Sequence, residues 1–310
     1  MLHITNGDAA VPIIKSTGVT GDILPWRDVL HEGPVPAPAT LDSLRPLRAR
    51  FLAEGGGAAV EVARELEERD RRLGAMGADE EVALWFEHDL YDQLQLAQVL
   101  DWCATSRRAP TARTPRLTLI QADDYLGMMK TDDARARWQA RLDVTDAQLE
   151  AAQRAWGAFS SPDPRAIERV LDEIGALPFM RPALKRHLEE FPAVDNGLSR
   201  TERQTLETLV VGSWPFHDLF HAAHIEREDP FFLGDLVFLD LLKALASGDE
   251  PLVRMDHEKA WLTDAGRETL AGTRDRVATL GIDRWLGGVH LRGRHVPFRW
   301  NPIAARIVAS

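Results

Sequence analysis

The sequence contains only one cysteine, Cys103, among 310 residues. A single thiol can form neither an internal disulfide nor a zinc site made of cysteines alone, and within a predicted helix it is expected to be packed and inert. Long apolar runs are missing too. No run reaches the roughly 18 residues that span a bilayer, and the first residues lack the pattern of a signal peptide. We therefore expect a soluble, cytoplasmic protein with no membrane partner.

Basic residues are scarce relative to acidic ones. The 37 lysines and arginines stand against 48 aspartates and glutamates, which gives a net charge of −11. This balance argues against a wholly basic nucleic-acid binder and leaves only a local basic patch open. The hydrophobic share of 45% and the charged share of 27% are close to the globular average, so we expect folded domains with sizeable cores. The length suits about two domains of roughly 150 residues.

Three common motifs of nucleotide-binding and hydrolytic enzymes are absent. The sequence holds no Gly-x-x-x-x-Gly-Lys-Ser/Thr, no Gly-x-Gly-x-x-Gly and no Gly-x-Ser-x-Gly. The run of glycines at 55–57 lies between two predicted helices, where a flexible joint is expected rather than a phosphate loop. No cofactor is indicated. Without a dinucleotide fingerprint, a hydrolase or a transferase is favoured over an oxidoreductase.

Short strands alternate with helices over the first 127 residues. Strands are predicted at 2–5, 22–26, 82–86 and 117–120, and helices at 9–16, 41–53, 58–73 and 90–103. The continuous apolar run from Val82 to Phe86 is typical of a buried strand in a parallel sheet. The alternation predicts an α/β domain with a mostly parallel sheet over residues 1–127.

The rest of the chain divides into two regions with different patterns of predicted elements. Residues 128–197 are predicted to be a helical connecting region, with helices at 134–142, 145–159, 165–174 and 178–191. Residues 198–310 begin with helices near 199–211, 216–225 and 234–246, followed by short strands at 252–254 and 260–262. This order is that of a winged helix, so we expect a winged-helix-like α+β C-terminal domain. Two more strands are predicted at 289–291 and 296–300.

Polar side chains follow three of the predicted N-terminal strands. The first strand is followed by Asn6, Gly7 and Asp8, the second by Asp28, His31, Glu32 and Gly33, and the third by Glu87, His88, Asp89, Asp92 and Gln93. In an open α/β sheet, ligands bind outside the carboxyl ends of the strands, where the strand order reverses. The sequence therefore predicts a site for a small polar molecule at these strand ends.

Acid–base roles at this predicted site fall to the two histidines. His31 or His88 would act as general acid or base, and Glu32 or Asp89 would orient it. The other residues named above would bind the ligand. The structural alternative is that Asp8 and Asp89 only cap helices and that His88 is a hydrogen-bonded core residue.

Metal sites are not favoured. Zinc and manganese bind histidine and carboxylate side chains, which occur at His31 and Glu32 and in the run Glu87–Asp89. Neither of these two stretches has a recognised spacing of metal ligands. A second set, His217, His221 and His224, lies on one face of a predicted helix. It lacks the glutamate of the His-Glu-x-x-His proteases, and one helix rarely completes a tetrahedral site, so a structural role is expected there.

One basic segment ends the chain. Residues 284–310 carry five arginines and no acidic side chain, against a net charge of −16 elsewhere. The alternative function is therefore regulatory, with the C-terminal module binding nucleic acid or protein, and Arg292, Arg294, Arg299 and Trp300 would contact a nucleic acid. The segment could equally dock onto the acidic remainder of its own chain. The predicted recognition helix offers Asp235, Asp240 and only Lys243, which suits phosphate contact poorly.

Three stretches carry a family resemblance: residues 3–8 (HITNGD), 26–36 (WRDVLHEGPVP) and 84–94 (LWFEHDLYDQL). They resemble the bacterial family catalogued as domain-of-unknown-function family 1835. Residues 284–290 (RWLGGVH) resemble the C-terminal part often attached to such domains. The resemblance implies that residues 1–125 form a unit, and it transfers no activity and no catalytic residue.

Overall fold

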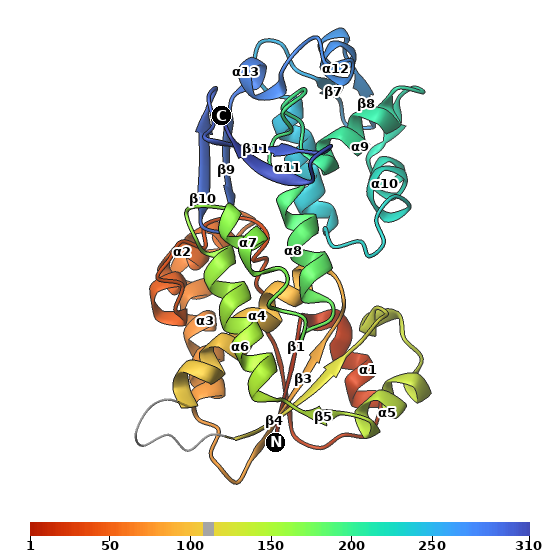
Figure 1. Cartoon of the computed structure of the whole chain (residues 1–310). Helices are drawn as coiled ribbons and strands as arrows, with labels where there is room; N and C mark the ends of the chain where they lie inside the picture. The colour runs from red at the N-terminus through yellow and green to blue at the C-terminus, as the bar shows by residue number, and fades with distance from the viewer. Residues whose placement is uncertain (108–114) are drawn as a thin grey trace. The chain divides into compact units, whose positions relative to one another are not determined.

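The computed structural model describes residues 1–107 and 115–310, which form two compact units (Figure 1). Unit 1 comprises Met1–Leu184 and Gly287–Val289, and unit 2 comprises Lys185–Leu286 and His290–Ser310. The division along the main chain falls inside helix α8 (Met180–Leu188). The three-domain division at residues 127 and 197 stays a prediction.

A five-stranded, mostly parallel sheet forms the centre of unit 1. Its strands are β1 (Leu2–Thr5), β2 (Asp22–Pro25), β3 (Glu81–Phe86), β4 (Arg116–Gln121) and β5 (Leu142–Asp143), in the order β2-β1-β3-β4-β5. All neighbouring pairs are parallel except β4 with β5. The predicted α/β class with a mostly parallel sheet is confirmed. The prediction of a helix over 134–142 is wrong at its end. The observed helix ends at Gln139, and residues 142–143 form a strand that pairs with the outer edge of β4.

One face of the sheet is covered by α1 (Val11–Ser16) and α5 (Thr131–Gln139), with short 3-10 turns at Asp8–Ala10 and Leu126–Met128. His3 of β1 is fully buried on this face, where its ring lies 5.1 Å from that of Trp138. Its Nδ1 accepts a hydrogen bond from Trp85 Nε1 at 3.1 Å, and its Nε2 donates to the carbonyl of Thr20. Burial lowers the pKa of His3, so this histidine is a neutral core residue.

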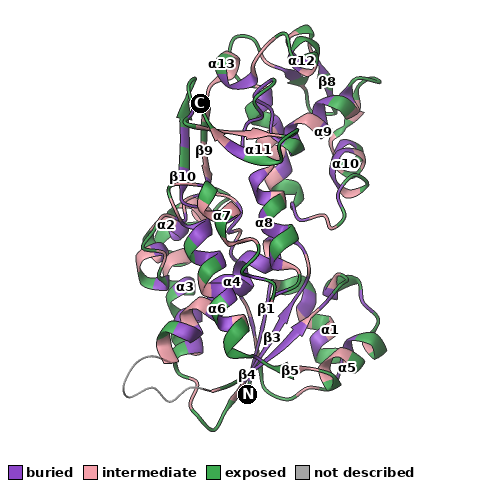
Figure 2. Cartoon of the chain, in the orientation of Figure 1, coloured by how far each residue is buried: buried purple, intermediate pink, exposed green. Residues whose placement is uncertain are grey.

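The remaining helices of this unit are α2 (Leu41–Ala53), α3 (Ala59–Gly74), α4 (Leu90–Arg107), α6 (Asp146–Phe159) and α7 (Arg165–Val170) (Figure 1). Helix α4 follows β3 and packs against α6, and two thirds of its residues are buried (Figure 2). Cys103 is among them, and burial raises the pKa of its thiol to about 12. Thr145 caps α6 as its sequence predicts.

Unit 2 begins with three helical segments around a small antiparallel sheet. These are α9 (Arg200–Leu209), α10 (Phe216–Phe220) with a π-helical turn at His221–Ile225, and α11 (Asp235–Leu245). The sheet has the order β6-β8-β7, made of Trp214–Pro215, Lys259–Leu262 and Val253–Met255. Leu206, Leu219, Phe238 and Leu242 form the centre of its core. Ser199 caps α9 in the predicted capping box.

The end of the chain adds two short helices and two strand pairs to this unit. The helices are α12 (Asp264–Leu270) and α13 (Arg276–Leu280). Strand β9 (Ile282–Leu286) pairs with β10 (Val289–Gly293), and β11 (Phe298–Asn301) pairs with β12 (Arg306–Ala309). The two strands predicted around Gly293 therefore exist, but each pairs with a partner that the sequence pattern did not reveal.

None of the helices within the described part of the chain has the length and apolar character needed to cross a bilayer.

Gly266 provides a test of packing in unit 2. A Cβ at this position would lie 2.3 Å from the carbonyl oxygen of Leu252 and 2.5 Å from Leu262 Cδ1. We expect Gly266→Ala to lower the free energy of unfolding by about 1–3 kcal/mol, because the backbone must shift to admit the methyl group. Denaturant unfolding measures the change.

The matched control is Gly157→Ala on α6, where an added Cβ meets nothing within 4 Å. Alanine should stabilise that helix by roughly 0.5–1 kcal/mol. Equal effects of the two substitutions would contradict the packing argument.

Candidate functional site

The strand order of unit 1 reverses between β1 and β3. From β1 the chain moves outward to β2 on one side, then returns to place β3 on the other side of β1. Crevices at such a reversal are where doubly wound sheets bind ligands. The loops that follow Thr5 and Phe86 both leave the sheet here. The polar residues predicted after the first and third strands are thus brought to one place.

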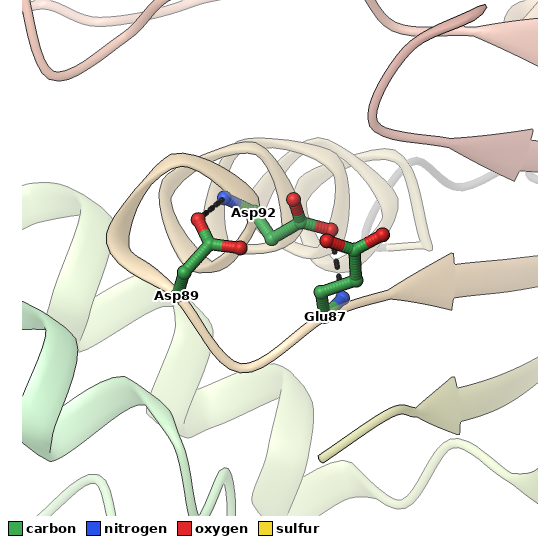
Figure 3. A group of neighbouring side chains, drawn as sticks. All are labelled: Glu87, Asp89 and Asp92. Carbon is green, nitrogen blue, oxygen red and sulfur yellow. Dashed lines mark hydrogen bonds between the residues drawn. The ribbon is translucent and has the colours of Figure 1, made fainter. Parts of the chain in front are cut away.

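Asp92, in the first turn of α4, joins these two loops. Its Oδ2 accepts a hydrogen bond from Asn6 Nδ2 at 2.8 Å, and its Oδ1 accepts one from the backbone N–H of Glu87 at 2.7 Å. The N–H of Asp92 donates to Asp89 Oδ1 at 3.2 Å (Figure 3). Asp89 thus accepts a hydrogen bond from the first turn of the helix, which is the capping role that the structural alternative predicted.

Glu87 is held from two further directions. Its Oε1 accepts a hydrogen bond from the N–H of Leu126 at 2.8 Å, and its carbonyl accepts one from Gln93 Nε2 at 2.6 Å. The amide of Asn6 is oriented by the N–H of Gly7, which donates to Asn6 Oδ1 at 2.6 Å. The loops after β1, β3 and β4 therefore share one hydrogen-bonded network.

Three carboxyl groups are buried together in this network. Glu87, Asp89 and Asp92 are each at most 5% exposed, and each offers an oxygen within 4.8 Å of the other two (Figure 3). The hydrogen bonds that they accept come from neutral N–H groups, and no lysine or arginine among the described residues forms an ion pair with them. We call these three residues the carboxyl cluster.

Burial without a cationic partner raises the pKa values of the cluster. Burial, together with the charge of Asp89, raises the pKa of Glu87 to about 8. Burial raises the pKa of Asp89 to about 6, and it raises that of Asp92 well above its usual value. Near neutral pH the cluster as a whole therefore holds more protons than three exposed carboxyl groups would hold. Neighbouring carboxyl groups with separated pKa values are suited to act as acid and base.

Among the described residues of unit 1, the carboxyl cluster is also the group that could hold a metal ion, since hard divalent cations prefer carboxylate oxygens. Of the five residues considered as ligands from the sequence, only Glu87 and Asp89 belong to it. His31, Glu32 and His88 do not.

The two predicted catalytic histidines border this region in different ways. His88 is half-buried, and its ring lies 5.3 Å from that of Tyr125 and 5.9 Å from that of Phe179. His31 is buried with its ring 5.9 Å from Tyr91. The Tyr91 hydroxyl donates to the carbonyl of Asn6 at 3.4 Å. Tyr91, which sequence reasoning missed, thus lies between His31 and the cluster.

Asp28 belongs to a separate ion-pair network, which also binds the backbone carbonyl of Glu32. Asp28 Oδ1 accepts hydrogen bonds from Arg48 Nε at 3.0 Å and from Nη2 at 2.7 Å, and both side chains are 1% exposed. Arg48 Nη1 donates to the carbonyl of Glu32 at 2.7 Å. Arg48 therefore fixes the loop after β2, a role that the prediction of a helix over 41–53 did not indicate.

Gly33 and Asp8 also have structural partners. Gly33 has φ +75°, and a Cβ there would lie 2.6 Å from the ring of Phe51, so only glycine fits. Asp8 is exposed and binds Arg27 through both carboxylate oxygens. The suggestion that Asp8 caps a helix is wrong, because the first helical turn begins at Asp8 itself and has no side-chain cap.

The C-terminal arginines are partly neutralised within unit 2. Arg284 binds Glu190 at 3.0 Å, Arg299 binds Asp275 at 2.6 Å, and Arg292 lies 3.7 Å from Asp283. Arg294 is exposed, and Trp300 is half-buried in β11. The positive charge available to a nucleic acid is therefore smaller than the sequence count of five.

The three histidines of the α10 region do not form a group. His224 is fully buried, and its Nε2 accepts hydrogen bonds from the N–H groups of Phe232 and Leu233. Burial lowers its pKa to about 4. His217 and His221 are exposed and lie near Asp218 and Glu226. A structural role for His224 agrees with the expectation from the sequence.

Comparison with known proteins adds no further assignment, since no protein-family model matches the chain and no curated protein matches it. The resemblance to family 1835 stays a prediction.

The Arg48–Asp28 pair gives a first prediction for this region. Arg48→Met should lower the free energy of unfolding by about 3–5 kcal/mol, because it leaves the buried Asp28 carboxylate without its main partner. Denaturant unfolding of wild type and variant measures the loss. Arg50→Met, at an exposed position of the same helix, should change it by less than about 0.5 kcal/mol. Comparable losses in both variants would refute the role of the pair.

The raised pKa of Glu87 gives a second prediction. A buried glutamic acid whose pKa is about 8 when folded and 4.5 when unfolded stabilises the fold fully below pH 4.5 and loses that contribution as the pH rises toward 8. Glu87→Gln keeps the hydrogen-bond acceptor and cannot ionise. Between pH 5 and pH 9 the wild type should therefore lose on the order of a few kcal/mol more unfolding free energy than the variant.

The measurement is denaturant unfolding at pH 5, 7 and 9, with Glu61→Gln on the exposed side of α3 as the charge-matched control. Parallel pH profiles for wild type and Glu87→Gln would contradict a raised pKa at Glu87.

Proposed function

We propose that unit 1 binds a small polar molecule at the β1/β3 strand ends and performs acid–base chemistry of the hydrolase or transferase type there. The observation that carries the proposal is the hydrogen bond between Asn6 and Asp92, which draws the two loops of the strand reversal around Glu87 and Asp89. Buried carboxyl groups without cationic partners weaken a fold. A binding or catalytic use gives a reason for their retention in this position.

The carboxyl cluster would supply both an acid and a base. Glu87, with the higher pKa of about 8, is assigned the proton donor, and Asp89, with a pKa of about 6, is assigned the proton acceptor. The carboxyl pair suits these tasks better than the histidine–carboxylate pairs expected from the sequence. His31 packs against Tyr91, while His88, half-buried beside Tyr125, is placed to contact a ligand.

Ligand-induced stabilisation tests the proposal. Wild type, Asp89→Asn and the exposed control Asp132→Asn are screened by thermal shift against nucleotides, sugar phosphates, amino acids, Mg²⁺ and Mn²⁺. A ligand at 100 times its Kd adds about 2.7 kcal/mol to the unfolding free energy. We expect an organic compound to stabilise the wild type and the control, and to lose most of this effect in Asp89→Asn.

Two results would overturn this assignment. Stabilisation by divalent cations alone, lost in Asp89→Asn, would make the carboxyl cluster a metal site rather than an acid–base pair. Organic hits that keep their full effect in Asp89→Asn would place the ligand elsewhere in the molecule.

The element order of unit 2 supports a second candidate, a winged-helix-like interaction module. Helix, short strand, two helices and two strands follow one another from α9 to β8, with the sheet order β6-β8-β7. Residues 198–272 carry 14 acidic and 7 basic side chains, and the exposed side of α11 presents Asp235 and Asp240. These charges repel phosphate and favour a protein partner over nucleic acid.

A further inference from the structure

A pocket of about 470 Å³ lies among α2, α3 and α4 in unit 1. Its size falls within the range of small-molecule sites. Helix α4 contributes Gln98 and Trp102, which follow Asp92 by about 9 and 15 Å along the helix axis. The pocket is therefore distinct from the carboxyl cluster, and the proposed function makes no use of it.

The charge of the pocket lining is negative. Four carboxylates and two guanidinium groups line it, which gives a net charge of −2. Both cations are already engaged: Arg45 Nη2 lies between Asp42 at 2.8 Å and Asp70 at 3.0 Å, and Arg71 binds Glu68. Glu67 is exposed and forms an ion pair with no residue that the structure describes. The lining thus offers carboxylate charge to a ligand and no spare cation.

Gln98 supplies a second, independent feature. This side chain is 2% exposed, and its Oε1 accepts a hydrogen bond from Trp26 Nε1 at 2.7 Å. An indole N–H can only donate, so the amide oxygen is fixed toward Trp26, and Nε2 is the donor left for the pocket. Within residues 1–107 and 115–310, no group accepts a hydrogen bond from this Nε2. A ligand oxygen would satisfy it.

We propose that this pocket binds a small organic cation that also carries a carbonyl or hydroxyl oxygen. The ammonium or guanidinium group would lie near the Glu67 carboxylate and the indole of Trp102, which attracts cations to its ring face. The oxygen would accept the hydrogen bond from Gln98 Nε2.

Isothermal titration of the full chain with L-argininamide tests the proposal, since this probe has two cationic groups and a carbonyl oxygen. We expect one binding site. Agmatine, which lacks the carboxamide, should bind at least about threefold more weakly, because a hydrogen bond to the buried amide is lost. Succinate, of similar size and opposite charge, should not bind.

Substitutions on one helix locate the binding. Glu67→Gln should weaken argininamide binding at least about threefold, which is the range of an exposed charge pair. Glu61→Gln removes the same charge from an exposed position of α3 outside the pocket and should leave the affinity unchanged. Thermal unfolding of each variant confirms that the fold is kept. Asp89→Asn should also leave the affinity unchanged.

Several outcomes would overturn the proposal. The first is no binding of argininamide at concentrations up to about 10 mM, where even a Kd in the millimolar range is detected. The others are binding of succinate, equal binding of agmatine and argininamide, and equal weakening by Glu61→Gln and Glu67→Gln. Loss of binding in Asp89→Asn would move the ligand to the strand-end site. Failure of this proposal leaves the proposed function intact, since the two sites respond to different substitutions.

Discussion

The hydrogen bonds accepted by Asp92 hold together the two loops of the N-terminal unit that carry the carboxyl cluster. Asp92 is fully buried at the start of α4, and its two oxygens bind the loop after β1 and the loop after β3. The carboxyl ends of parallel strands lie at the same edge of a sheet, but the loops that follow them stay together only where side-chain contacts join them. Here one carboxylate binds both Asn6 and Glu87 and so holds the two loops of the strand reversal together.

Burying carboxyl groups without a cationic partner lowers the stability of the fold. Glu87 and Asp89 lie beside Asp92 with no lysine or arginine partner found among the described residues. Burial therefore resists the ionisation of both groups, and the charge of Asp89 further resists that of Glu87. Elsewhere in the unit, the chain neutralises buried acids with arginine, as Arg48 does for Asp28. The contrast marks the carboxyl cluster as different in kind from the structural ion pairs around it.

Helix α4 links the features of this unit because so much of it is buried. Its first turn carries Asp92 and Tyr91 at the strand ends, and later turns carry Gln98 and Trp102 at the pocket. Several buried glutamine and aspartate side chains on one helix require partners from neighbouring elements. Those partners come from the loops after β1, β2 and β3, and they allow these polar side chains to be buried along with the apolar ones.

Local sequence patterns determined the elements of this protein. The apolar run ending at Phe86, the cap at Thr145 and the capping box at Ser199 each specify a strand or a helix through interactions among near neighbours. They also placed Asn6, Glu87, Asp89 and Asp92 at strand ends. Tertiary structure alone decided which of these residues meet. The strand order places β3 beside β1, so the loops that carry Asn6 and Glu87 both bind Asp92. Asp28, after β2, instead forms an ion pair with Arg48, 20 residues away. Such pairings depend on burial and on long-range contacts, which residue spacing does not encode.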